Sequence, residues 1–177
     1  MKQFDPGEFV FLDEAGFSLS MTRLYGWSLR GQRLVEAVPA QRGKNLSVLG
    51  ALDKEGLIVT RSKVGAMNRA DIETFLRRDL LPRLLPGSVL VLDNASIHRG
   101  GKIEQIVRRA GCSLLYLSPY SPDFNPIELA WSYIKNAVRA VAPRDEGARL
   151  AAIQTAQQSL PAEHAVAWFR KCGYALP

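Results

Sequence analysis

The chain has 177 residues, of which 47% are hydrophobic and 23% are charged. This is the composition of one ordinary globular domain, and it argues against a disordered or coiled-coil protein. No apolar run approaches the ~18 residues needed to cross a bilayer, and the first residues lack the pattern of a signal peptide. Lysine and arginine total 23 against 17 acidic residues, a net charge of +6. Such a surplus favours a polyanionic partner, although many basic domains have none.

The two cysteines, Cys112 and Cys172, form no CxxC pair. They exclude a zinc finger and a disulfide framework, and they favour a reducing compartment.

The hydrophobic pattern predicts strands first and then strands that alternate with helices. A strand is expected over 8–13, followed by a polar and basic stretch over 18–44. Two further strands, 46–52 and 56–64, flank a tight turn at 53–56. The remaining predicted elements are a helix over 68–85, a strand over 88–93, a basic helix over 101–110, a strand over 112–117, and helices over 127–141, 146–160 and 162–171.

This order of elements predicts an α/β fold with one mixed sheet of about five strands flanked by helices. Residues 143–177 would form a C-terminal helical extension, and 18–44 would be a basic insertion. No linker divides the chain, so we expect a single domain over 1–177.

Two aspartates, Asp13 and Asp93, each follow an apolar strand. If these strands are neighbours, the two carboxylates emerge at one sheet edge, where divalent cations about 3.5–4 Å apart would relieve their repulsion. An aspartate also commonly follows a strand because it favours turns, so either residue alone could be structural. Glu14 is the alternative to Asp13. Side chains alternate along a strand and place Asp13 on the face of Phe9 and Phe11, which favours Asp13.

A third acid, Glu128, lies at a predicted helix start. Asn125 would be the N-cap, and a glutamate at the third helical position can bond back to the N-cap amide, so a capping role is open beside a catalytic one. The same helix face carries Lys135 and Arg139, which are candidates for contacts to DNA phosphates.

Three carboxylates of this kind suit phosphodiester cleavage. Two hard cations held by carboxylate oxygens activate a water and stabilise the leaving oxygen without a side-chain nucleophile. Mg²⁺ needs only one or two carboxylates together with substrate phosphates. His98 and His164 are too few and too far apart for a histidine metal cluster.

Three segments resemble the signatures of mariner-superfamily DDE transposases. They read FLDEAG over 11–16, VLDNASIH over 91–98 and SPYSPDFNPIE over 118–128. The likeness is closest to the bacterial insertion-sequence branch, whose spacing is matched by the 34 residues between Asp93 and Glu128. GWSLRGQR over 26–33 and CGY over 172–174 also look like this family, so the resemblance covers essentially the whole chain.

The resemblance implies an RNase H-like fold in which Asp13, Asp93 and Glu128 bind two Mg²⁺ ions, with Mn²⁺ as a substitute. It implies cleavage at the ends of a mobile element and attack of the freed 3′-hydroxyl on target double-stranded DNA, with TA as a possible target. It also implies a homodimer in the active complex and a cytoplasmic, nucleoid-associated protein of a bacterium. Relatives carry helix-turn-helix modules before the catalytic domain, whereas the first strand here is expected near residue 8, so we expect that region to be absent.

Further candidates adjoin these motifs. Asn94 and His98 follow Asp93, and His98 could orient a water or phosphate or could cap a helix. The stretch 18–44 could bind DNA through phosphate contacts and stacking, could be a solvated hairpin, or could clamp a second subunit. Its candidate DNA-binding residues are Trp27, Arg30, Arg33 and Lys44.

Two other functions remain open from the sequence. One is an RNase H-like nuclease that only hydrolyses, and the other is a degenerate or domesticated transposase that only binds DNA or a partner. All three acidic positions are filled, which argues against the degenerate alternative.

Overall fold

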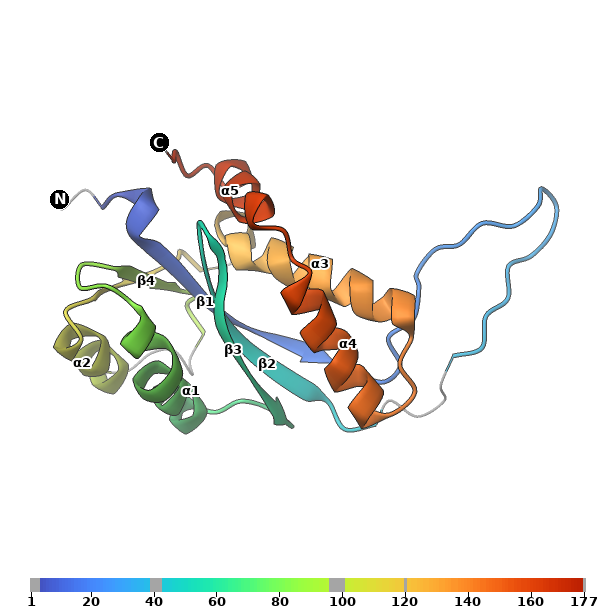
Figure 1. Cartoon of the computed structure of the whole chain (residues 1–177), viewed down its shortest axis with the longest axis horizontal. Coiled ribbons are helices and arrows are strands. Elements are labelled where there is room, and N and C mark those ends of the chain that lie inside the picture. Colours follow the sequence, from blue (N-terminus) through green and yellow to red (C-terminus); the bar gives the residue numbers. More distant parts are fainter. Residues whose placement is uncertain (1–3, 39–42, 96–100, 120, 177) are drawn as a thin grey trace.

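The computed structural model describes residues 4–38, 43–95, 101–119 and 121–176. Five strands form one mixed sheet in the order β3–β2–β1–β4–β5 (Figure 1). β1 pairs antiparallel with β2 and parallel with β4, and the outer strands β3 and β5 extend these two pairings. The strands are β1 Phe9–Phe17, β2 Leu46–Asp53, β3 Gly56–Val64, β4 Val89–Leu92 and β5 Ser113–Tyr116. The predicted mixed α/β sheet is confirmed.

Helices cover both faces of this sheet (Figure 1). α1 Arg69–Phe75 and α2 Gly101–Arg109 lie on one face. α3 Pro126–Val141, α4 Glu146–Gln158 and α5 Ala162–Lys171 lie on the other. In the described part of the chain, no helix combines the length and apolarity that crossing a membrane requires.

The predicted helix over 68–85 is shorter than expected. After α1 the chain passes into a π-helical turn, Leu76–Leu80, and a 3₁₀ turn, Leu81–Arg83. Pro82 lies in that last turn, and a proline cannot donate the backbone hydrogen bond that would continue an α-helix. Asn68 is the N-cap of α1 and forms a complete capping box with Asp71.

β1 is longer than the predicted 8–13, because its second half pairs with β2. The register runs from Phe11 opposite Leu52 to Phe17 opposite Leu46. Asp13 therefore lies within β1 and not at its end, which corrects the expectation from the sequence. Pairing with β4, in contrast, extends only from Phe9 to Leu12, so Asp13 is the first residue of β1 beyond that pairing.

Side-chain alternation along β1 separates two cores. Phe9 and Phe11 pack into the core beneath α3, α4 and α5. Val10 and Leu12 pack into the core beneath α1 and α2. Successive side chains of a strand point to opposite faces of the sheet, and in β1 both faces are covered by helices.

Residues 18–44, named the arm here, connect β1 to β2, and most of the described part of the arm extends away from the sheet and helices (Figure 1). The described part of the arm contains no helix or strand, and every residue from 23 to 38 is exposed. The arm is joined to the body by Arg149 of α4, whose buried guanidinium donates to the carbonyl oxygens of Phe17 and Lys44 at 3.1 and 2.7 Å. One side chain thus holds both ends of the arm.

Candidate active site

Asp13 and Asp93 follow corresponding positions on neighbouring parallel strands. The β1–β4 register ends with Leu12 opposite Leu92, and each aspartate is the next residue. Adjacent strands lie about 4.7–4.9 Å apart, so the backbones of the two aspartates leave this pairing side by side. Asp13 is buried, with 7% of its surface exposed, and Asp93 is half-buried. The structure therefore brings this pair to one region of the sheet, as the sequence predicts.

The face of β1 distinguishes Asp13 from Glu14. Phe11 and Ala15, the residues two before and two after Asp13, both pack into the core beneath α3. Alternation places Asp13 on that same face and Glu14 on the opposite one. Because Glu128 belongs to α3, this arrangement favours Asp13 over Glu14 as the partner of Glu128.

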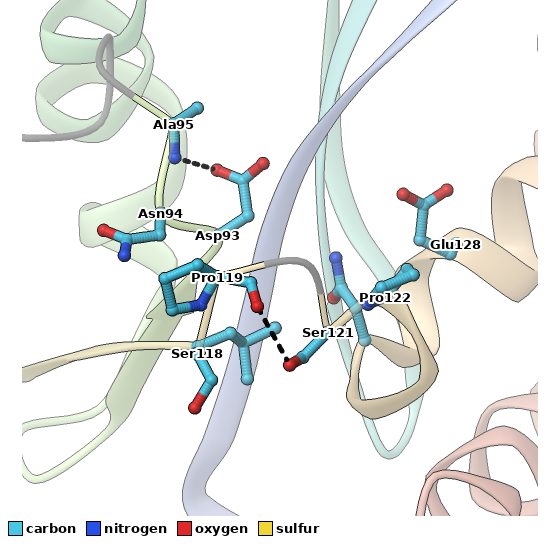
Figure 2. A pocket seen from close by; sticks show the side chains of 10 residues that line it. Asp93, Asn94, Ala95, Ser118, Pro119, Ser121, Pro122 and Glu128 are labelled. Carbon is cyan, nitrogen blue, oxygen red and sulfur yellow. Dashed lines mark hydrogen bonds between the residues drawn. The ribbon is translucent and has the colours of Figure 1, made fainter.

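Asp93 and Glu128 line one pocket of about 530 Å³. In the view of Figure 2 they lie on opposite sides of the pocket, with Ser118, Pro119, Ser121 and Pro122 between them. Asp13 is not among the lining residues. The wall consists of Asp93, Asn94 and Ala95 after β4, Leu117, Ser118 and Pro119 after β5, and Ser121, Pro122, Asn125 and Glu128 at the start of α3.

The Asp93 carboxylate also stabilises its own loop. Its Oδ1 accepts a hydrogen bond from the backbone N–H of Ala95 at 3.1 Å (Figure 2). This is the local turn contact typical of an aspartate after a strand. One carboxylate oxygen of Asp93 thus stabilises a turn, which is the structural role considered from the sequence. Asp93 nevertheless lines the pocket.

Glu128 does not form the capping box that the sequence allows. Asn125 occupies the N-cap position, but its side chain makes no capping hydrogen bond. The backbone N–H of Asn125 instead donates to the carbonyl oxygen of Pro122 at 2.9 Å. At α1, in contrast, Asn68 and Asp71 form both halves of the box. The exposed Glu128 carboxylate lies at the pocket and is not used as a cap.

Asn125 is a residue whose place in the site the sequence did not predict. It is only 4% exposed and lines the pocket. Its Oδ1 is buried and has no hydrogen-bond partner among the described residues. A buried amide oxygen without a partner carries a cost, which a hydrogen-bond donor or a cation in the pocket would remove. From the sequence alone, Asn125 was expected only as the N-cap of the helix, so no role in the pocket was predicted for it.

The donor atoms of the pocket are of the type that Mg²⁺ prefers. Carboxylate oxygens of Asp93 and Glu128 and amide groups of Asn94 and Asn125 lie on its wall, and hard cations take oxygen ligands. Across the described ranges, however, no three His, Cys, Asp or Glu side chains are gathered closely enough to hold an ion together. The structure therefore shows two acids on one pocket and the third on the adjacent strand. Closely spaced carboxylates repel one another unless a cation lies between them.

The predicted DNA-binding residues lie outside the pocket. Lys135 and Arg139 are partly exposed on α3, about 10 and 16 Å beyond Glu128 along the helix axis. Arg139 donates to the side-chain oxygen of Asn136 at 3.0 Å. In the arm, Trp27, Arg30, Arg33 and Lys44 are exposed. His98 lies outside the described residues, whereas Asn94 lines the pocket.

Comparison with known proteins identifies the family. A family profile described as "DDE superfamily endonuclease" matches residues 8–151 of this chain. Two Caenorhabditis briggsae proteins, the Tcb1 and Tcb2 transposable element transposases, are 27% and 28% identical to this chain over 162 residues. Each alignment covers 86% of this chain and 59% of the relative, so the chain spans about six tenths of the length of these relatives.

Solved structures agree on the fold. The Mos1 mariner paired end complex with Mn matches with a TM-score of 0.77 at 16% identity, over 97% of this chain and 54% of that one. The catalytic domain of Mos1 mariner transposase matches with a TM-score of 0.65 at 14% identity, over 94% of this chain and 78% of that one. The expected RNase H-like fold is thereby confirmed. With a family match over most of its length, this chain belongs to the DDE superfamily endonucleases and has homologues among the Tc1/mariner transposases.

Proposed function

We propose that this chain is the catalytic domain of a DNA transposase of the bacterial insertion-sequence branch. It would cleave phosphodiester bonds at the ends of a mobile element and join the freed 3′-hydroxyl to target double-stranded DNA. The observation that carries this proposal is the shared pocket of Asp93 and Glu128, with Asp13 beside Asp93 on the neighbouring strand. The two curated relatives are transposases, and one solved neighbour is described as a strand transfer complex.

Asp13, Asp93 and Glu128 would hold the divalent ions, Mg²⁺ or its substitute Mn²⁺. When bound, such ions activate the attacking oxygen and stabilise the leaving oxygen of the phosphodiester. Asp13, buried within β1, and half-buried Asp93, directly after β4, would form the fixed side of the metal site, because paired strands hold both. The exposed Glu128 on the first turn of α3 would close the site from the other side.

The arm and α3 would supply the contacts to macromolecules. Seven large hydrophobic side chains in the described part of the arm are exposed, with Trp27 at 99% and Tyr25 at 90%. An exposed apolar group of this size marks an interaction surface, since soluble monomers rarely leave one uncovered. The arm would therefore contact DNA or a second copy of the chain in a homodimer, and Lys135 and Arg139 would contact DNA phosphates.

We further propose that residues 1–177 form one catalytic domain, with the arm as its insertion and 143–177 as its helical extension. The two cysteines are both free and buried. This suits the reducing bacterial cytoplasm, where the protein would act at the nucleoid.

The proposal is tested by nicking of supercoiled plasmid DNA in Mg²⁺ or Mn²⁺. Wild type should nick, and Asp93→Asn should lose at least about a hundredfold in rate because an amide no longer offers an anionic ligand. Asp123→Asn is the matched control, since Asp123 is exposed in the same loop region but does not line the pocket. Nicking by Asp93→Asn at the wild-type rate would overturn the catalytic assignment.

A second assay separates the transposase from a nuclease that only hydrolyses. A donor duplex with a pre-cleaved 3′-hydroxyl end is incubated with a target plasmid, and joined products are counted. Joining that depends on Asp93 supports the transposase. Nicking without any joining supports the hydrolytic nuclease instead.

A further inference from the structure

Tyr174 links the C-terminal segment to the loop that precedes Glu128. Its hydroxyl donates to the carbonyl oxygen of Phe124 at 2.7 Å, across 50 positions of the sequence. Phe124 ends the 3₁₀ turn Pro122–Phe124, and α3 begins two residues later. The bond therefore holds the chain immediately before the turn of α3 that carries Glu128.

The ring of Tyr174 packs against β1 at the same time. Ring centroids lie 5.5 Å from Phe9 and 5.3 Å from Phe11, and Phe169 of α5 is 5.9 Å away. Aromatic pairs at these separations stabilise one another beyond their buried area. Phe11 is two residues before Asp13 on the same face of β1. One side chain thus touches the strand of Asp13 and the loop of Glu128.

The backbone after α5 is built to place this tyrosine. Gly173 has a φ of 87°, a left-handed conformation that glycine adopts at low cost. The N–H of Tyr174 donates to the carbonyl oxygen of Phe169, and that of Gly173 to Arg170, both at 3.0 Å. Cys172 is buried. These contacts give a structural account of the Cys-Gly-Tyr segment, whose role the sequence left unassigned.

We infer that Tyr174 is a positioning residue for the proposed active site: through the Phe124 carbonyl it fixes the first turn of α3, and hence Glu128, against the strand of Asp13. The inference rests on the proposed function, because it takes Glu128 and Asp13 to act together. Burial raises the pKa of Tyr174 to about 12, so its hydroxyl stays protonated and donates throughout the neutral and mildly alkaline range.

The test measures Mn²⁺ binding by the electron paramagnetic resonance signal of the free ion, at a temperature where every variant is folded by circular dichroism. Tyr174→Phe keeps the ring and removes only the hydroxyl. We expect it to weaken Mn²⁺ binding on the order of tenfold, the effect of losing an outer partner that orients a metal ligand. Its melting temperature should stay close to wild type, because water can bond the carbonyl of the exposed Phe124.

Tyr133→Phe is the matched control. Tyr133 also donates its hydroxyl to a backbone carbonyl, that of Ser159, at 3.2 Å, and it lies on α3 away from the pocket lining. This variant should bind Mn²⁺ as wild type does. A purely structural role for Tyr174 would lower the melting temperature and leave the Mn²⁺ affinity of the folded protein unchanged.

Asp93→Asn distinguishes a failure of the inference about Tyr174 from a failure of the proposed metal site. If Asp93→Asn loses Mn²⁺ binding while Tyr174→Phe binds as wild type does, the role of Tyr174 is refuted and the proposed site stands. If Asp93→Asn binds as strongly as wild type, or wild type binds no Mn²⁺, the proposed metal site fails and the inference fails with it. Equal losses in Tyr133→Phe and Tyr174→Phe would also refute the inference.

Discussion

The ring of Trp131 lies directly over the backbone of Gly50. A Cβ atom at Gly50 would come within 2.7 Å of Cη2 and 2.9 Å of Cζ2 of that ring. Gly50 is the residue of β2 opposite Asp13, and Trp131 lies one helical turn after Glu128. This contact therefore sets how closely the helix of Glu128 approaches the strand of Asp13.

Gly50→Ala should destabilise the protein and impair the site. An added methyl group in a packed core forces neighbouring groups apart at a cost of about 1–3 kcal/mol. The neighbour here is the large ring of Trp131, which is 1% exposed. Urea denaturation would measure the loss in the free energy of unfolding.

The matched control for this substitution is Gly101→Ala. A Cβ at Gly101 meets nothing within 4 Å, and the residue starts α2, where alanine is a better helix former. Stability should be unchanged or slightly increased. Equal losses in the two variants would mean that the contact with Trp131 is not what excludes a side chain at Gly50.

The two helix-start asparagines should respond differently to alanine. Asn68→Ala removes a complete capping box and should cost about 1 kcal/mol of stability. Asn125→Ala removes a side chain that makes no capping bond and has a buried oxygen without a partner among the described residues. It should cost less, and thermal denaturation of the two variants side by side checks this. A larger loss for Asn125→Ala would indicate that its amide is a stabilising cap after all.

Arg149→Lys should release the ends of the arm. Arg149 is 1% exposed and donates from one nitrogen, Nη1, to the carbonyl oxygens of both Phe17 and Lys44, whereas a lysine side chain ends one atom shorter in a more strongly hydrated ammonium. Leaving one of these carbonyls without its bond should cost about 1–3 kcal/mol. Arg144→Lys is the control, because Arg144 bonds the carbonyl of Ala37 from an exposed position. It should be close to neutral in the same denaturation experiment, and equal effects would contradict the role assigned to Arg149.

Burial also determines how the thiols respond to pH. It raises the pKa of both Cys112 and Cys172 above the ordinary value of 9.0. The native state therefore favours the protonated thiol, and its contribution to stability is complete below pH 9 and declines as the pH rises through the native pKa. The free energy of unfolding, measured by urea denaturation, should fall from about pH 9 upward.

Because the thiolate is the reactive form, both cysteines should react with a disulfide reagent at pH 8 far more slowly in the folded chain than in urea. Rapid reaction of the folded chain would show that the thiols are accessible.

Local sequence patterns were sufficient for much of the fold. The turn between β2 and β3 is one example, since Asp53 accepts hydrogen bonds from the backbone of Glu55 and Gly56 within the turn itself. The apolar face of α3 is another, and its residue Trp131 is buried as the helical period predicts. Such features depend on residues close in sequence, so they can be recognised without the structure.

Features that depend on distant residues could not be recognised in this way. The extension of β1 beyond Asp13 arises from pairing with β2, about 30 positions away. The role of Tyr174 depends on Phe124, which no pattern in the C-terminal segment indicates. The three acids were predicted from their places after two strands and at a helix start, together with motif likeness, and only the structure shows which two share a pocket.

If Asp13, Asp93 and Glu128 hold the same metal ions, metal-directed cleavage of the protein will map all three to one site. Fe²⁺ replaces Mg²⁺, ascorbate and peroxide generate hydroxyl radicals at the bound ion, and mass spectrometry maps the cuts in the backbone. A metal site shared by the three acids predicts cuts near all of them, and the joint disappearance of these cuts in Asp93→Asn. Cuts that spare any of the three segments, or that persist in Asp93→Asn, would contradict it.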